Sequence, residues 1–155
     1  QQPNSMFVGQ NVRYEGTPMF RHLVNVPMEQ RIEFPVAEDL QMGFCTGLAL
    51  QGFFPIAIYP RFDFLLLAFN QLVNHLDKLE QMSRGQFTPK VIVRTAVGKR
   101  SPLDAGPQHT QNHTEAFWRM LTNTEVYEIK RVDKIKGTYD AAIHSKKSVV
   151  VVENF

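Results

Sequence analysis

Six short stretches rich in β-branched and aromatic residues recur along the chain, and they restrict the possible folds more than any other feature. In order they read SMFVG, RIEFPV, PIAIYP, KVIVRT, EVYEIKRV and SVVVVEN. Four of the six are nearly continuous apolar runs, which is the pattern of strands buried on both faces. The sequence therefore predicts a sheet that is covered on both sides.

Helix-length segments separate these strands, and we expect helices over residues 38–51, 64–84, 113–122 and 138–145. In the second segment, apolar residues spaced three and four apart give one broad buried stripe. Strands that alternate with helices imply right-handed crossovers and a mainly parallel sheet. The predicted fold class is α/β, with about six strands in a single domain that spans the 155 residues.

Three predicted loops lie where a parallel α/β sheet binds ligands, at the carboxyl ends of its strands. One follows RIEF and carries Glu38, one follows PIAIY and contains residues 61–64, and a long one follows VIVRT and leads to His109. These loops contain most of the unusual chemistry in the chain. We therefore expect the functional site at this edge of the sheet.

Charge and composition exclude several classes of protein. A net charge of +2, with scattered basic residues, is too small to indicate a nucleic-acid or membrane surface. The longest strongly apolar run, FDFLLLAF, is too short to span a bilayer, and no signal peptide opens the chain. The single cysteine, Cys45, excludes an internal disulfide and suits a reducing compartment. We expect a cytoplasmic protein that binds neither nucleic acid nor membrane.

The stretch QHTQNH contains two histidines, His109 and His113, four residues apart. On a helix this spacing puts both side chains on one face, where they can chelate zinc. The zinc-protease pattern, however, requires Glu where Thr110 stands, together with a third ligand nearby. The polar residues also suit the start of a helix. Catalysis, metal binding and helix capping are all open from these residues, although we expect no metal site.

Two common catalytic motifs are absent from the sequence. AVGKRS differs from the phosphate-binding loop of nucleotide-binding proteins, which requires Gly where Val93 stands and Ser or Thr where Arg100 stands. No G-x-S-x-G motif is present, which argues against a serine-type triad. The candidate chemistry must therefore come from other residues.

Glu38 lies where a buried strand gives way to a helix that contains Gly43 and Gly47. An acidic residue in the first helical turn is favoured by the helix dipole, so a purely structural role is sufficient. The glycines lower helix propensity and thus indicate close packing or a nearby ligand.

The aromatic residues Phe62 and Phe64 follow the third strand, in the stretch YPRFDF. Each is as compatible with a hydrophobic core as with a platform for a cofactor. Asp63, between them, is suited to cap the helix that follows.

These motifs occur in a characteristic order: an acid at a strand-to-helix turn, a helix with spaced glycines, P-I-x-I-Y-x-x-F-D-F, a strand ending in Arg94, QHTQ, and a final SVVVVEN. In order and spacing the chain resembles the pyrimidine-binding domain of thiamine-diphosphate enzymes of the transketolase type. It resembles in particular the N-terminal half of the beta subunit of 2-oxo-acid dehydrogenases. The resemblance covers nearly the whole chain, and its specificity lies in the order of the motifs.

The resemblance implies that the cofactor is thiamine diphosphate and that Glu38 hydrogen-bonds N1′ of its aminopyrimidine. A carboxyl group at N1′ promotes the shift of the 4′-amino group to an imino base. An aromatic ring stacks on the pyrimidine in this family, and Phe62 or Phe64 matches it, with the spacing from Glu38 favouring Phe64. The YEG stretch, which begins at Tyr14, resembles another cofactor-side turn.

The resemblance also assigns the two histidines to the substrate. His109 matches a histidine that faces the substrate, and His113 stands ready to assist it. The chain departs from the family where Gln10 and Asn11 replace a usual acidic pair, and where the loop before His109 is longer. Substrate choice is therefore not carried over from the family.

The family binds the diphosphate through Mg²⁺ in a separate domain that contains a Gly-Asp-Gly stretch, and no such stretch occurs here. The C-terminal domain of the dehydrogenase beta subunits is also absent. We therefore expect one subunit of a split enzyme, or an excised fragment, whose active site is completed in trans by a diphosphate-binding partner that holds Mg²⁺. The chain should be an oligomer, homomeric or heteromeric, and inactive alone.

The expected reaction is decarboxylation of a 2-oxo acid or two-carbon acyl or ketol transfer. One alternative is a non-catalytic interaction module with the same fold, although the presence of both Glu38 and His109 argues against it. Another is an unrelated α/β binding protein, which a different strand order would identify.

Overall fold

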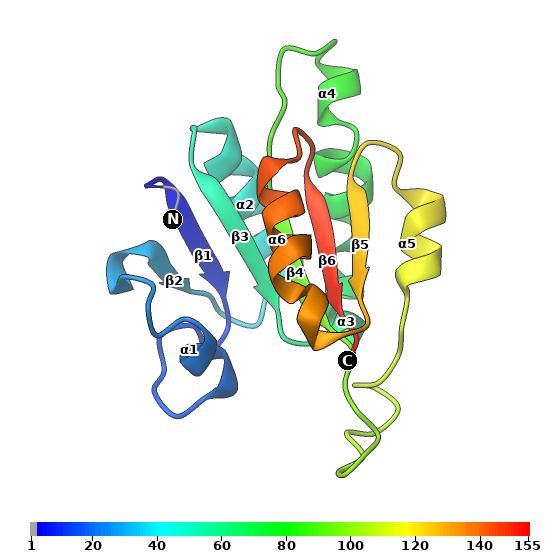
Figure 1. Ribbon diagram of the computed structural model, residues 1–155. Coiled ribbons are helices and arrows are strands. Elements are labelled where there is room, and N and C mark those ends of the chain that lie inside the picture. The colour runs from blue at the N-terminus through cyan, green and yellow to red at the C-terminus, as the bar shows by residue number, and fades with distance from the viewer. Residues whose placement is uncertain (1–2) are drawn as a thin grey trace.

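The computed structural model describes residues 3–155, and within that range it contains one six-stranded sheet whose strands all run parallel (Figure 1). The strands are β1 (Ser5–Gly9), β2 (Arg31–Glu33), β3 (Phe54–Tyr59), β4 (Ile92–Ala96), β5 (Glu125–Ile129) and β6 (Val149–Glu153). Their order in the sheet is β2-β1-β3-β4-β6-β5. The predicted α/β class is confirmed, and each predicted strand is present.

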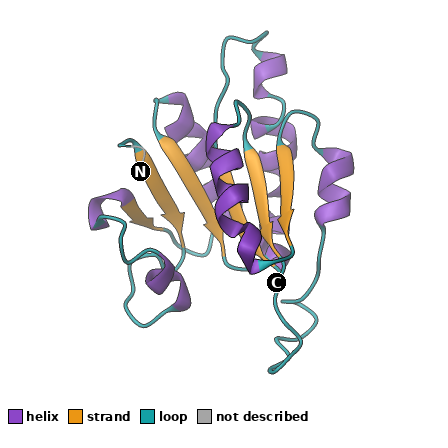
Figure 2. Ribbon diagram, viewed as in Figure 1, coloured by secondary structure: helices purple, strands orange, loops and turns teal. Residues whose placement is uncertain are grey.

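Both faces of β6 are buried, as its apolar run predicts. In β6, Val150 and Val152 pack into the core on one face, whereas Val149 and Val151 pack into the core on the other. Successive side chains of a strand point to opposite faces, so a run of four valines fills both. Figure 2 shows helices on the two sides of the sheet.

The helices divide between the two faces (Figure 1). One face is covered by α2 (Glu38–Leu50), by the helical segment that begins with α3 (Phe62–Leu65), and by α5 (Thr114–Met120). The other face carries α1 (Pro18–His22) and α6 (Ile135–His144). Short 3₁₀ turns lie at Met28–Gln30 and Val132–Lys134.

The helices on the second face leave part of the sheet open. A cavity of about 690 Å³ lies over β1, β3 and β4, and apolar side chains such as Phe54, Ile56 and Ile143 line most of it. Arg94, in the middle of β4, and Glu153, at the carboxyl end of β6, line the same cavity. The cover predicted for both faces is therefore incomplete within residues 3–155.

The predicted single helix over 64–84 is wrong in detail. It begins earlier, with α3, and continues as a 3₁₀ turn (Leu66–Ala68), a π-helical turn (Gln71–Leu76) and α4 (Leu79–Met82). Leu72 and Leu76, four residues apart in the π-helical turn, are both buried in the core, as an α-helix would also allow. The apolar spacing therefore predicts a helix here but does not predict its π-helical hydrogen bonding.

Other helix boundaries differ less. α6 begins three residues before the predicted start at residue 138, and α5 lies within the predicted range 113–122. α1 has no counterpart among the predicted helices. Its signal is local, because the Thr17 hydroxyl accepts a hydrogen bond from the Phe20 N–H and Pro18 occupies the first turn.

The carboxyl ends of all six described strands lie at one edge of the sheet, the lower edge in Figure 1, and the loop between β4 and α5 extends beyond it. At this edge β1 and β3 approach closely. A Cβ atom on Gly9 would lie 2.6 Å from the carbonyl oxygen of Ile58, so only glycine fits. The loops that follow the strands, although far apart in the sequence, therefore lie near one another at this edge.

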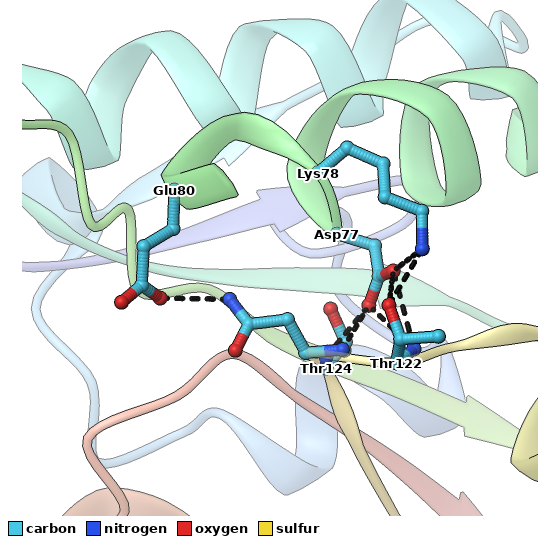
Figure 3. A network of polar contacts seen from close by, with 6 residues as sticks. Asp77, Lys78, Glu80, Thr122 and Thr124 are labelled. Atoms are coloured by element: carbon cyan, nitrogen blue, oxygen red, sulfur yellow. Dashed lines mark hydrogen bonds and ion pairs between the residues drawn. The ribbon is translucent and has the colours of Figure 1, made fainter. Parts of the chain in front are cut away.

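A buried carboxylate ties the helical segment to the loop between α5 and β5 (Figure 3). Asp77 accepts hydrogen bonds from the backbone N–H groups of Thr122, Asn123 and Thr124, at 2.7 Å for Thr124, and lies 2.7 Å from Lys78 Nζ. Burial alone would raise the pKa of Asp77, but the bonds from Lys78 and the three N–H groups outweigh it. The pKa of Asp77 therefore lies well below its ordinary value.

We expect Asp77→Asn to lower the free energy of unfolding by about 2–3 kcal/mol at pH 7, because an amide cannot accept all of these bonds. Since the folded-state pKa is depressed, this stabilisation is complete above the ordinary pKa near 4 and is lost as the pH falls toward the folded-state value. Urea unfolding at pH 7 and pH 2.5 measures both effects. Exposed Asp133 provides the control, and Asp133→Asn should change stability by less than about 0.5 kcal/mol. An equal loss for Asp77→Asn at both pH values would contradict the charge-based account.

Candidate active site at the carboxyl edge of the sheet

Glu38 is the first residue of α2, and its side chain points into the carboxyl edge of the sheet, with only 7 % of the residue exposed. Its carboxylate accepts a single long hydrogen bond within residues 3–155, 3.4 Å from Gln10 Nε2. A carboxylate has about four lone-pair sites, so most of its accepting capacity is unused. Asp39, the next residue, is exposed and accepts a bond from Gln71.

Tyr59 fixes the backbone beneath Glu38. Its hydroxyl donates a hydrogen bond of 3.1 Å to the Glu38 carbonyl oxygen from the carboxyl end of β3. Burial, and then the neighbouring Cys45 and Glu38, raise the pKa of Tyr59 far above its ordinary value. The hydroxyl therefore stays protonated and acts as a permanent donor.

Two glutamines near Glu38 were not among the predicted site residues. Gln10 follows β1 and faces Glu38, at a position where the resemblance implied only a departure from an acidic pair. Gln41, one turn after Glu38, donates to the carbonyl oxygens of Val8 and Ile58 at 3.2 and 3.0 Å. It therefore joins β1 to β3 where the chain connections change direction, which is the usual ligand site of such sheets. The only sequence signal for the role of Gln41 is an amide side chain three residues after Glu38, on the same face of the helix.

The two candidate aromatic residues have different surroundings. Phe62 is fully buried, with its ring 4.9 Å from that of Phe117. Phe64 is 37 % exposed, and its ring makes an edge contact with that of His109 at 5.3 Å. Phe62 thus belongs to the core, while Phe64 offers an accessible ring face at the edge of the sheet.

The structure separates the two histidines. His109 lies in the β4–α5 loop against Phe64, whereas the His113 ring packs 5.4 Å from Phe62. Because α5 begins at Thr114, the pair does not share a helical face. His113 occupies the cap position of α5 without a side-chain capping bond, and Asn112, before it, accepts a hydrogen bond from the Thr114 N–H at 3.0 Å. Residues 3–155 contain no group of three or more His, Cys, Asp or Glu side chains arranged to hold a metal ion.

The position of His109 depends on backbone contacts within its own loop. The Gly98 N–H donates to the His109 carbonyl oxygen at 2.8 Å. A Cβ atom on Gly98 would lie only 2.1 Å from that oxygen, so any other residue would displace the loop. The loop therefore folds back on itself and returns His109 to the sheet edge.

Asp63 has a role different from the predicted helix cap. The cap position of α3 is Arg61, and the Asp63 carboxylate instead accepts from Gln111 Nε2 at 2.8 Å. It also receives a longer bond from the Gln111 N–H. The loop after β3 therefore anchors the far end of the loop that carries His109.

Tyr14 is not joined to these groups. It is exposed in the turn between β1 and α1, where its carbonyl oxygen accepts from the Thr17 hydroxyl. Among the residues that the structure describes, no hydrogen bond or ring contact links Tyr14 to Glu38 or Phe64.

None of the helices within residues 3–155 has the length and hydrophobicity that a membrane-spanning helix requires.

The arrangement combines a nearly buried acid, an accessible aromatic ring and a histidine at one sheet edge. An acid with free lone pairs can share a proton with a ring nitrogen, and an aromatic face can stack on a planar heterocycle. The fold and these groups together define an α/β domain suited to one side of a flat cofactor.

Comparisons with known proteins assign the family. A family profile described as "Transketolase, pyrimidine binding domain" matches residues 1–154. The chain is 31 % identical over 123 residues to pyruvate dehydrogenase E1 component subunit beta-3, chloroplastic, of Arabidopsis thaliana, covering 79 % of this chain and 30 % of that protein. It is also 31 % identical over 123 residues to the E1 subunit beta of Porphyra purpurea, covering 79 % and 36 %.

Solved structures agree on the fold. A structure titled "Split gene transketolase, inactive beta4 tetramer" superposes with a TM-score of 0.72 at 16 % identity, over 97 % of this chain and 45 % of that one. A transketolase from Campylobacter jejuni gives 0.68 at 11 % identity, over 96 % and 22 %.

The chain therefore belongs to the transketolase pyrimidine-binding domain family. This is a family of thiamine-diphosphate-dependent enzymes, and the match confirms the predicted resemblance. The chain spans about a third of the length of the pyruvate dehydrogenase beta subunits that it matches.

We expect Asp63→Ala to loosen the His109 loop without unfolding the domain. Loss of the acceptor for Gln111 should speed amide hydrogen exchange at residues 108–111 by roughly tenfold, the equivalent of about 1.4 kcal/mol. Exchange measured by mass spectrometry provides the readout. The matched control is Asp39→Ala, which also removes an acceptor for a glutamine side chain but lies outside the loop. Equal exchange in the two variants would show that Asp63 does not anchor the loop.

Proposed function

We propose that this chain is the pyrimidine-binding part of a thiamine-diphosphate-dependent enzyme that decarboxylates a 2-oxo acid or transfers a two-carbon acyl or ketol group. Glu38 would hydrogen-bond N1′ of the aminopyrimidine, Phe64 would stack on that ring, and His109 would face the substrate. Phe62 and His113 would support these groups from the core, since their rings pack against each other.

The state of Glu38 is the observation that carries this proposal. A carboxylate buried to this extent is costly unless it is hydrogen-bonded, and here one long bond from Gln10 is its only side-chain partner within residues 3–155. A protonated ring nitrogen of a cofactor would supply the missing donor. The residues present therefore fit the aminopyrimidine of thiamine diphosphate.

The protein's part in the reaction follows from this geometry. When bound, thiamine diphosphate supplies the carbanion chemistry, and the protein orients and polarises it. Glu38 would hold or release a proton at N1′ while Tyr59 fixes its backbone. Phe64 would fix the plane of the pyrimidine, and the Gly98 and Asp63 contacts would keep His109 beside it. The turn that contains Tyr14 resembles a cofactor-side turn of the family, but we propose no direct contact between the Tyr14 side chain and the cofactor.

The site would be completed by a second domain or subunit. The outer face of the α2 region is apolar next to Glu38, where Val36, Leu40 and Phe44 are exposed, with Leu40 at 62 %. Contiguous exposed apolar side chains mark interaction surfaces. We propose that a diphosphate-binding partner, in trans or elsewhere in a longer chain, covers this face and holds Mg²⁺ and the diphosphate. On this account residues 1–155 alone would be inactive. We also propose a cytoplasmic location, because the single cysteine, Cys45, is a buried free thiol, which suits a reducing compartment.

We expect Glu38→Gln, in the full-length protein assembled with its partner, to reduce turnover of 2-oxo acids by roughly 10²–10⁴-fold because a proton-transfer group is lost. The dissociation constant of thiamine diphosphate should rise by less than about tenfold, since an amide still hydrogen-bonds N1′. Asp39→Asn is the matched control and should leave both quantities within about twofold. Wild-type turnover in Glu38→Gln would sink the assignment. A wild-type assembly that binds no cofactor would favour the non-catalytic module.

A pair of substitutions separates the roles of the two aromatic residues. Phe64→Leu should raise the dissociation constant of the cofactor by up to about tenfold, the worth of one ring contact, with little change in the melting temperature. Phe62→Leu should instead lower stability by about 1–3 kcal/mol through lost core packing. Calorimetric titration and thermal unfolding measure the two effects. The opposite pattern would transfer the stacking role to Phe62.

A further inference from the structure

Gln10 is the only side chain within residues 3–155 that donates a hydrogen bond to the Glu38 carboxylate, and it comes from a different part of the sheet. Gln10 follows β1, whereas Glu38 begins α2, and Gln10 Nε2 lies 3.4 Å from Glu38 Oε1. Gln10 is half-buried and Glu38 is buried. The contact is therefore largely shielded from water, and neither residue forms it through a neighbour in the sequence.

The backbone on both sides of Gln10 is fixed. The Glu33 carboxylate, at the end of β2, accepts hydrogen bonds from the Asn11 N–H at 2.6 Å and from the Arg13 N–H at 3.0 Å. Asn11 has a φ of 61°, in the left-handed region that asparagine adopts more readily than most residues. Gly9, on the other side, is paired with both β2 and β3. Only the side-chain torsions of Gln10 are therefore free, and the fold itself places its amide near α2.

Gln41 does not act as a second donor to Glu38. Its Nε2 is bonded to the carbonyl oxygens of Val8 and Ile58, so both of its N–H groups are used. The remaining amide atom, Gln41 Oε1, is an acceptor, and it is buried without a partner. Of the two glutamines near Glu38, only Gln10 can therefore stabilise a charge on the carboxylate.

Other titratable groups lie on the elements around Glu38. Within residues 3–155 they are Glu33 at the end of β2, Tyr59 on β3, Asp39 and Cys45 on α2 itself, and His75 in the π-helical turn. β1 and the 3₁₀ turn at Leu66–Ala68, which also pack against α2, contain no titratable side chain. None of the five groups is bonded to the Glu38 carboxylate.

Each of these groups is neutral near pH 7 or is engaged elsewhere. Burial raises the pKa of Tyr59 far above its ordinary value and raises the pKa of Cys45 to about 12, so both stay protonated. Asp39 accepts a hydrogen bond from Gln71, which is also bonded to the His75 ring. The protonation of Glu38 therefore depends chiefly on its own burial and on the amide of Gln10.

Burial and the amide act on Glu38 in opposite directions. Loss of water disfavours a charged carboxylate, whereas a hydrogen bond donated to the carboxylate favours the charged form. An amide carries no charge and does not titrate, so it remains a donor at every pH at which a carboxyl group changes its protonation. A glutamine is thus suited to keep a buried acid able to ionise without adding a charge of its own.

We propose that Gln10 is a positioning residue that sets the protonation of Glu38. By holding Oε1 it leaves Oε2, which accepts no hydrogen bond within residues 3–155, for the ring nitrogen of the aminopyrimidine. The catalytic meaning of this control rests on the proposed function, although the contact itself does not. The inference adds that Gln10 determines the pH range in which the site works.

Infrared spectroscopy tests the contact without any turnover. In the full-length assembly freed of cofactor, a pH titration follows the carbonyl band of protonated carboxyl groups, and the part that disappears in Glu38→Gln belongs to Glu38. Gln10→Met keeps the side-chain length but removes the donor, so the Glu38 midpoint should rise by about one pH unit. Gln10→Glu adds a like charge as well, and the upper midpoint of the pair should rise by roughly two units.

Gln71→Met is the matched control for these variants. Gln71 Nε2 donates to Asp39 at 3.3 Å, which is an amide–carboxylate bond of nearly the same length on an exposed acid. Its removal should leave the Glu38 midpoint unchanged. A Glu38 midpoint that stays at the wild-type value in both Gln10→Met and Gln10→Glu would overturn the proposal.

The same variants have a kinetic signature in the complete enzyme. The acidic limb of the pH profile of kcat/KM, which reports groups of the free enzyme, should move to higher pH by the shift seen in the infrared titration. The dissociation constant of thiamine diphosphate at neutral pH should change by less than about tenfold. A merely structural role for Gln10 would instead lower kcat/KM equally at every pH, and that result would contradict the proposal.

The two readouts keep this inference separate from the proposed function. A raised Glu38 midpoint in Gln10→Met, together with wild-type turnover in Glu38→Gln, would retain the control of Glu38 by Gln10 and reject the proposed reaction. Loss of turnover in Glu38→Gln, with unchanged midpoints in the Gln10 variants, would reject the role of Gln10 alone.

Discussion

Burial of the central strands on both faces is the constraint on which the rest of the structure depends. β6 contributes alternate valines to both cores, and such a strand is stable only inside a parallel sheet covered by helices. Because all strands then run the same way, their carboxyl ends meet at one edge. Glu38, Phe64 and His109, which follow three different strands, therefore lie at the same edge of the sheet, although no local sequence signal connects them.

The site is built from two kinds of contact that differ in rigidity. Glu38 stands on the long helix α2, whose neighbour Gln41 is bonded to both β1 and β3. His109 stands on a loop that is held by the Gly98 backbone bond and by Asp63. Hydrogen bonds of this kind contribute about 1 kcal/mol each, close to the entropy cost of ordering a residue or two. The surroundings of Glu38 are thus preorganised, whereas the loop that carries His109 is held by fewer contacts.

The candidate site is also incomplete in a specific sense. Glu38 has unused accepting capacity, Arg61 has an N–H without an acceptor, and apolar side chains on the α2 region have no cover within residues 3–155. Each of these costs free energy in isolation, and the proposed function assigns a ligand to two of them: a ring nitrogen of the cofactor to Glu38 and an apolar protein surface to the α2 region.

The sequence by itself determined the α/β class, the six strands and the loops that meet at the ligand-binding edge, because apolar periodicity and strand burial are local properties of the chain. The order of its motifs also determined the family. Tertiary structure alone decided that Phe64 is exposed and Phe62 is core, that Asp63 anchors Gln111 rather than capping α3, and that the 64–84 helix contains a π-helical turn. It alone joined Gln10 to Glu38 and left the buried Nε of Arg61 without an acceptor. These outcomes depend on which side chains from distant segments compete for the same space and the same hydrogen bonds, and no spacing along the chain records that competition.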